Sequence, residues 1–275
     1  MKTVTFYYVR HGQTEYNVEG RMQGWCDSPL TEKGLSDACT AKKALREVDL
    51  KRAFCSPLKR CRDTCAIVLE GREVAVTYMD GLKEHHFGSF EGTVEKENRD
   101  IVNRIRFELD DDFRPYGGEW GQDFRKRIQE TFEEIYAQCE DKDNVLVVSH
   151  GAVFLYALEV LLGYRQDDYL AEVRAEGEEA MIAPNGYVGS FCRDDNGYHL
   201  LQMSGYWPIT YSDVADIIQT FYCGVNGLDA AGATMTVELK LFENAEDTTG
   251  IEIPSAKVEY TFPEAGNDFY SITES

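Results

Sequence analysis

The chain has 275 residues, 43% hydrophobic and 12% aromatic, which is typical of a globular protein and excludes a disordered or fibrous one. Its 49 acidic against 28 basic residues give a formal net charge of −21, which argues against nucleic acid or an anionic membrane as a partner. No stretch approaches about 18 uncharged apolar residues, and Met1 leads directly into a strand pattern. We therefore expect neither a membrane span nor a signal peptide, and we expect a cytoplasmic protein.

Strands and helices are predicted to alternate along residues 1–208. The apolar alternation of Val4, Phe6 and Tyr8 predicts a first strand, followed by a helix at residues 30–48. Ser56 is expected to cap a helix that has Pro57 at its first position and ends at Gly71. The other predicted elements are strands at 53–55, 74–79 and 145–148, helices at 122–139 and 152–162, and a hairpin of 187–192 with 198–203.

This alternation predicts an α/β fold, a three-layer sandwich around a mostly parallel sheet.

The eight cysteines form no CxxC pair, so in a reducing compartment we expect them to be small core residues rather than metal ligands.

A second region is predicted after Pro208. Residues 209–275 hold 12 acidic and 2 basic residues, so −10 of the net charge lies there and −11 in the first 208. A helix at 212–223 and a hairpin of 235–241 with 258–262 are expected, which makes this a small β-rich C-terminal extension. Because a lone hairpin is marginally stable, its apolar face is expected to pack on domain 1–208. Self-association as a homodimer, or a lid over the active site, are the alternatives.

Two histidines follow buried strands. His11 comes after "TFYYVR" and His150 after "VLVVS", and each precedes a glycine that allows a sharp turn in a crowded place. Ligands of such sheets bind beyond the carboxyl ends of the strands. Either histidine alone is more simply a hydrogen-bonded residue at a strand end, but the pair indicates a site.

Two further segments carry charged residues that we expect near the same carboxyl ends of the strands. Lys59, Arg60 and Arg62 begin the helix after Ser56, where the helix dipole disfavours cations unless an anion binds. The stretch "LKEHHFGSFEG", residues 82–92, supplies Glu84 as a candidate acid, while Glu91 is expected to cap the loop. Metal binding by Glu84, His85 and His86 is a weak rival, because neighbouring side chains diverge.

Five stretches in order, "VRHGQTEYN", "RMQGWCDSPLTEKG", "CSPLKRCRDT", "LKEHHFGSFEG" and "VLVVSHG", resemble the signature blocks of the histidine phosphatase superfamily, whose fold is phosphoglycerate mutase-like. The resemblance covers residues 1 to about 160 and extends to the hairpin before residue 207. It implies a phosphomonoester hydrolase that acts on a small phosphate ester with neither a metal nor a cofactor.

The resemblance also implies the roles of individual residues. His11 resembles the nucleophile that takes the phosphoryl group, and Glu84 resembles the general acid. Arg10, Arg60 and His150 resemble the phosphate-binding trio. Asn17, Gln23 and Gly24 are expected to contact the phosphate or substrate.

Three functions are compatible with these residues. The first is hydrolysis of a phosphorylated metabolite. The second is a 2,3-bisphosphoglycerate-dependent phosphoglycerate mutase, although such mutases carry a longer segment than the 57 residues between Gly92 and His150. The third is a scaffold that binds a partner through its tail, against which the intact catalytic set argues. Trp120 stands where the phosphatase branch usually has serine, and it is expected, with Trp25, either to line the substrate pocket or to anchor loops.

Overall fold

The computed structural model describes residues 2–164, 183–202, 234–239, 256–261 and 273–274. The chain divides into two compact units, Met1–Trp207 and Pro208–Ser275. That residues 1–208 and 209–275 act as separate domains stays a prediction. Within the part described, no helix is long and apolar enough to cross a membrane.

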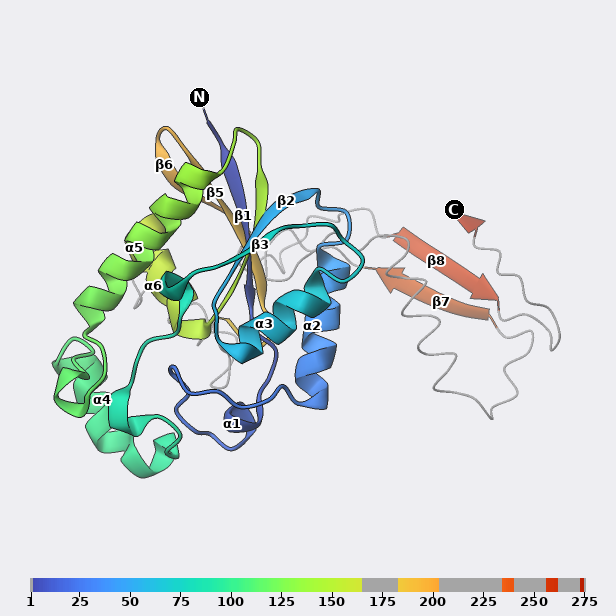
Figure 1. The fold of residues 1–275 in the computed structure, drawn as a ribbon. Helices are drawn as coiled ribbons and strands as arrows, with labels where there is room; N and C mark the ends of the chain where they lie inside the picture. Colours follow the sequence, from blue (N-terminus) through green and yellow to red (C-terminus); the bar gives the residue numbers. More distant parts are fainter. Residues whose placement is uncertain (1, 165–182, 203–233, 240–255, 262–272, 275) are drawn as a thin grey trace, which may run out of the picture. The chain divides into compact units, whose positions relative to one another are not determined.

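The first unit is built on a six-stranded sheet in the order β3-β2-β4-β1-β5-β6 (Figure 1). Strands β1 to β4 are mutually parallel, and β5 and β6 form an antiparallel hairpin that joins the edge of β1. The strands are β1 (Val4–Arg10), β2 (Leu50–Cys55), β3 (Val76–Tyr78), β4 (Asn144–Ser149), β5 (Val188–Asp194) and β6 (Gly197–Gln202).

Helices cover both faces of this sheet and complete the three layers that the sequence predicts. One apolar core joins β1 side chains such as Phe6 to α5 and α6, and the other joins β2 and β4 to α2 and α3. Both faces are buried because strand side chains alternate between them. The helices are α1 (Glu15–Val18), α2 (Glu32–Ala44), α3 (Lys59–Val68), α4 (Arg99–Glu108), α5 (Gly121–Gln138) and α6 (Gly151–Leu162).

The second unit contains an antiparallel pair, β7 (Thr234–Leu239) and β8 (Ala256–Thr261), with the short β9 (Thr273–Glu274) beside β8. The pairing agrees with the predicted hairpin. The predicted helix at 212–223 lies outside the described residues.

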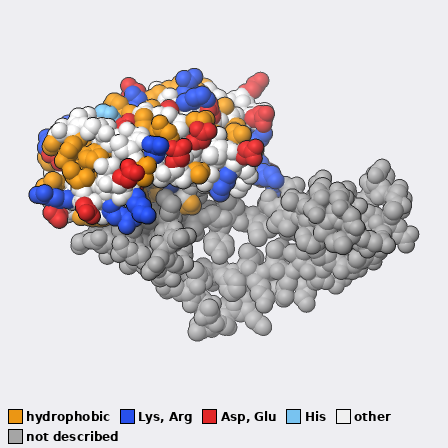
Figure 2. All heavy atoms as spheres, turned by 90° about the horizontal axis from the view of Figure 1, so that it is seen from below, with side chains coloured by type: hydrophobic (Ala, Val, Ile, Leu, Met, Phe, Trp, Pro, Cys, Tyr) orange, Lys and Arg blue, Asp and Glu red, His pale blue; other side chains and the backbone are white. Residues whose placement is uncertain are grey.

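One predicted helix start is wrong. Pro57 and Leu58 form a bend after Ser56, Leu58 is the N-cap of α3, and no Leu58 side-chain bond caps the helix. Helix α4 and the four short 3-10 helices, at Asp80–Leu82, Gly88–Phe90, Glu95–Asn98 and Arg114–Tyr116, were absent from the prediction. A small third core of six buried residues underlies α4 and the turns at Gly88–Phe90 and Arg114–Tyr116. On the face shown in Figure 2, basic and acidic side chains of the described residues are interspersed.

Candidate active site

The carboxyl ends of four parallel strands meet at one edge of the sheet, and each delivers a candidate residue. Arg10 at the end of β1 pairs with Ser149 at the end of β4, so the next residues, His11 and His150, are neighbours. The backbone N–H of His11 donates to the Ser149 carbonyl over 3.0 Å, and the two imidazole rings lie 5.3 Å apart. The parallel register thus explains why the two X-His-Gly sequences form one site.

The His11 ring is buried and oriented by its own loop. Its Nδ1 lies 2.8 Å from the carbonyl oxygen of Gly12, which can only accept, so Nδ1 carries the proton. The Nε2 atom accepts from the Nε of Arg60 over 3.3 Å. Burial, together with the positive charges of Arg60 and Arg10, lowers the pKa of His11 well below its ordinary value. The imidazole is therefore neutral, and the lone pair of Nε2 can attack once the Arg60 Nε–H moves away from it.

The glycines after the two histidines provide space rather than a sharp turn. Neither Gly12 nor Gly151 has a positive φ. A Cβ at Gly12 would lie 2.1 Å from the carbonyl oxygen of Gly34 in α2, and one at Gly151 would lie 3.2 Å from the Cζ of Arg10. The first glycine lets α2 approach the His11 loop, and the second makes room for a guanidinium.

Of the cations expected near the site, the structure brings Arg10 and Arg60 to His11. Both are buried, and the Nη1 of Arg10 donates to the Ala183 carbonyl over 2.5 Å. The buried Nε of Arg10 has no partner among the described residues. Arg62 instead lies 5.2 Å from the Tyr78 ring centroid, and Lys59 pairs with Asp63 on the same helix.

His150 is fixed by contacts from two strands. Its Nε2 lies 2.8 Å from the Oγ of Ser56, which follows β2. The Tyr8 hydroxyl donates to the His150 carbonyl over 2.6 Å and accepts from the His150 backbone N–H. Burial is the main cause that lowers the pKa of His150 well below its ordinary value. A neutral, rigidly held imidazole can donate one N–H to a phosphate oxygen.

Glu84 reaches the same edge from the loop after β3. Its Oε1 accepts the backbone N–H of His85 over 3.0 Å, and its Oε2 accepts that of Ala152, in the first turn of α6, over 3.2 Å. Burial raises its pKa, and the nearby Arg60 and Arg10 oppose that rise without cancelling it. A carboxyl whose neutral form persists to higher pH suits proton donation.

The structure gives the three expected substrate contacts different surroundings. The Oδ1 of Asn17 accepts from the Thr14 backbone N–H and from the Nδ2 of Asn185. The Nδ2 of Asn17 has no acceptor among the described residues. The Gln23 side chain accepts from the Thr14 hydroxyl and donates to Ser28. The Gly24 carbonyl accepts from Arg60 over 2.7 Å. Among the described residues the Asn17 amide thus has no acceptor for its Nδ2, whereas Gln23 and Gly24 contact the protein.

The two adjacent histidines of the Glu84 loop point to different neighbours. The His85 ring stacks on Phe124 with a centroid distance of 4.6 Å, and the His86 ring stacks on Trp25 at 4.5 Å. Glu91 accepts backbone N–H groups of its own and a neighbouring loop, as expected for a capping residue. Among the residues that the structure describes, no group of three or more His, Cys, Asp and Glu is arranged to hold a metal ion.

The structure also reveals residues that the sequence reasoning missed. Arg127 on α5 donates to the carbonyls of Gly81, Lys83 and Glu84, so it clamps the loop that carries the candidate acid. Asp27 accepts from the Nη1 of Arg60 over 2.8 Å. Neither residue carries a local signal, because an arginine on a long helix and an aspartate before Ser-Pro are both common on surfaces.

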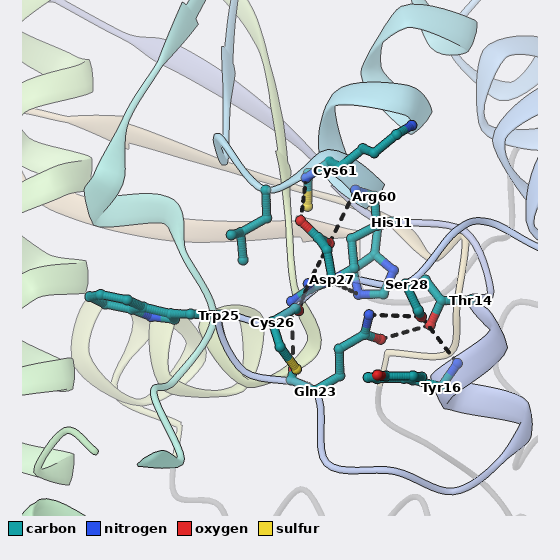
Figure 3. Close-up of polar contacts among 12 residues, drawn as sticks. His11, Thr14, Tyr16, Gln23, Trp25, Cys26, Asp27, Ser28, Arg60 and Cys61 are labelled. Atoms are coloured by element: carbon teal, nitrogen blue, oxygen red, sulfur yellow. Dashed lines mark hydrogen bonds and ion pairs between the residues drawn. The ribbon is translucent and has the colours of Figure 1, made fainter. Parts of the chain in front are cut away.

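Trp25 and Trp120 contact other parts of the described chain rather than His11. Figure 3 shows the Trp25 ring pointing away from His11 and Arg60, and its Nε1 donates to the Glu84 carbonyl over 2.8 Å. Trp120 is the N-cap of α5 and supplies no side-chain cap, while its ring lies 4.2 Å from the Arg114 guanidinium carbon. Trp25 therefore serves as a loop anchor.

Comparisons with known proteins agree with this geometry. The model of the histidine phosphatase superfamily (branch 1) matches residues 6–174. The chain is 35% identical over 159 residues to an adenosylcobalamin/α-ribazole phosphatase of Salmonella typhimurium, covering 57% of this chain and 78% of that protein. It is 37% identical over 152 residues to the 2,3-bisphosphoglycerate-dependent phosphoglycerate mutase 2 of Gloeobacter violaceus, covering 52% and 68%. The solved structure of YhfR from Bacillus stearothermophilus superposes with a TM-score of 0.63 at 31% identity, covering 72% of this chain and 96% of that one.

Proposed function

The chain belongs to branch 1 of the histidine phosphatase superfamily and is a phosphatase, and we propose that it hydrolyses a small phosphate ester through a phosphohistidine on His11. The observation that carries the assignment to His11 is the pairing of its Nδ1 with the Gly12 carbonyl, which leaves Nε2 as a neutral nucleophile beside Arg60.

The first step transfers the phosphoryl group. The lone pair of His11 Nε2 attacks phosphorus, a P–N bond forms, and the P–O bond to the leaving group breaks. Neutral Glu84 gives its proton to the departing oxygen and becomes a carboxylate. Arg10, Arg60 and His150 hold the negative charge of the transferring oxygens, with Asn17 as a further donor.

The second step regenerates the enzyme. The Glu84 carboxylate takes a proton from water, the water oxygen attacks phosphorus, and the P–N bond breaks with its electron pair returning to Nε2. Inorganic phosphate leaves, Glu84 is neutral again, and His11 recovers its initial form. Neither step calls for a metal ion, because the guanidinium groups supply the positive charge.

The test is to trap the phosphoenzyme. The protein is mixed with a labelled aryl phosphate in excess EDTA and quenched in denaturant, and we expect an acid-labile, base-stable label on the wild type. His11→Ala removes the label and the turnover. His199→Ala is the matched control, because His199 is an exposed histidine on β6 whose ring contacts Asp194. Activity that chelation abolishes and a divalent ion restores would contradict the proposed charge stabilisation.

The substrate class rests on the relatives. We propose a phosphorylated metabolite, since the phosphatase relative is named for α-ribazole chemistry. The mutase relative of similar identity makes mutase activity the second candidate. Incubation with 3-phosphoglycerate plus catalytic 2,3-bisphosphoglycerate separates the two, because a mutase yields 2-phosphoglycerate whereas a phosphatase releases inorganic phosphate.

A further inference from the structure

The Arg60 guanidinium is saturated by the protein itself. Its side chain has no exposed surface, and all five of its N–H positions face acceptors. The Nε donates to His11 Nε2 over 3.3 Å. The Nη1 donates over 2.8 Å to both Cys26 O and Asp27 Oδ1, and the Nη2 donates to Gly24 O over 2.7 Å and to Gln23 O over 3.5 Å.

Asp27 is the one anion among these partners, and it also caps α3. Its carboxylate accepts the backbone N–H of Lys59 over 2.6 Å and that of Arg60 over 3.4 Å. Figure 3 shows this side chain between the start of α3 and the Arg60 side chain. The negative charge that the helix N-terminus favours is therefore supplied by the protein, at the place where the sequence suggested a bound phosphate.

Arg10 differs from Arg60 in this respect. Within the described part of the chain its buried Nε has no partner, and its Nη1 donates to the Ala183 carbonyl. Relative to the described residues, the Arg10 Nε–H is therefore open to an incoming oxygen. Arg60 gains one only when its Nε–H leaves His11 Nε2, as that nitrogen bonds to phosphorus.

On the strength of the function proposed above, we propose that Asp27 is a positioning residue that serves as the internal counter-anion of Arg60. It holds the Arg60 Nε–H against the nucleophile before substrate arrives. Its charge offsets one of the two buried guanidinium charges and so weakens the binding of phosphate, which lets the product leave. The same carboxylate caps α3 and couples the helix start to the loop of residues 23–27.

Asp27→Asn separates charge from geometry. The amide oxygen in the place of Oδ1 still accepts from Arg60, and the negative charge is lost. The new NH2 group faces the Lys59 backbone N–H, so one capping bond of α3 is lost as well. We expect the Kd of inorganic phosphate, measured by calorimetry at physiological ionic strength, to fall about tenfold, as for one unit charge removed from a partly screened site. The KM for an aryl phosphate falls with it. Asp63→Asn is the matched control, because it removes the same charge from the exposed Lys59 pair of the same helix and leaves the phosphate Kd unchanged.

Two results would contradict the role of Asp27 as counter-anion: weaker phosphate binding in Asp27→Asn, or an unchanged phosphate Kd with a higher KM. Asp27 would then only cap α3. A melting curve accompanies each variant. If Asp27→Asn does not fold, Asp27→Ser removes the same charge with a smaller polar side chain and must show the same tightening of phosphate binding. Calorimetry needs no turnover, so a wild type that binds phosphate without hydrolysing esters would count against the proposed function alone. An effect of Asp63→Asn as large as that of Asp27→Asn would contradict a specific role for Asp27.

Discussion

Replacement of Glu84 by Gln tests whether this carboxyl is the proton donor. The side chain keeps its size, and its oxygen retains the 3.0 Å bond from the His85 backbone N–H. The new NH2 group then faces the Ala152 N–H, so one hydrogen bond is lost, which costs about 1 kcal/mol of stability. Loss of a general acid costs about 10²–10⁴ in rate. The activity loss should therefore far exceed what the small destabilisation explains.

The leaving group decides where that loss appears. An alkoxide needs the proton as the P–O bond breaks, whereas a nitrophenolate hardly does. In single-turnover phosphorylation followed by rapid quench, we expect Glu84→Gln to slow an alkyl phosphate by about 10³ and a nitrophenyl phosphate by less than about tenfold. Because the pKa of Glu84 is raised, the rate at which the wild type is phosphorylated by an alkyl phosphate is constant at low pH. It declines as the pH rises through the pKa of Glu84. The variant shows no such decline.

Glu91→Gln provides the comparison, since Glu91 makes backbone contacts in the same loop without a proposed part in proton transfer. A change that merely disturbs the loop slows both substrates alike. Equal losses for alkyl and nitrophenyl phosphates in Glu84→Gln would refute the assignment of Glu84 as the acid.

Three further outcomes follow from the contacts described. Trp25→Phe retains stacking but loses the N–H to the Glu84 carbonyl, and should slow alkyl but not nitrophenyl phosphate by about fivefold; equal slowing would contradict a role through Glu84. Phe6→Ala, which removes a ring stacked 5.0 Å from Phe191, should cost about 3–5 kcal/mol in urea unfolding, and a cost below about 1 kcal/mol would contradict its core position. Truncation after Pro208 should leave a folded enzyme with unchanged kcat/KM, and a shift of about tenfold would make the tail part of the active site.

The sequence was most informative where one chain segment carries its own signal. The position of His11 beside His150 follows from two apolar strands that each end in X-His-Gly, because parallel strands bring their carboxyl ends together. Helix α4 was missed for the opposite reason. Six of its ten residues are charged or polar, and of its four apolar residues only Val102 and Ile105 are buried, while Phe107 is 77% exposed. The helix therefore offers few apolar positions from which to predict it.

The wrong helix start at Ser56 and the missed Asp27 have a common cause. Ser56 has the right chemistry for a local N-cap, yet its hydroxyl lies 2.8 Å from the Nε2 of His150, a residue on another strand end. The α3 N–H groups are satisfied instead by Asp27, which lies more than thirty residues from them in sequence. Local rules fail in this way where a site draws side chains out of their local role. Asp27 caps α3 from a distant loop and also contacts the Arg60 side chain, which agrees with the proposed role of Arg60 beside His11.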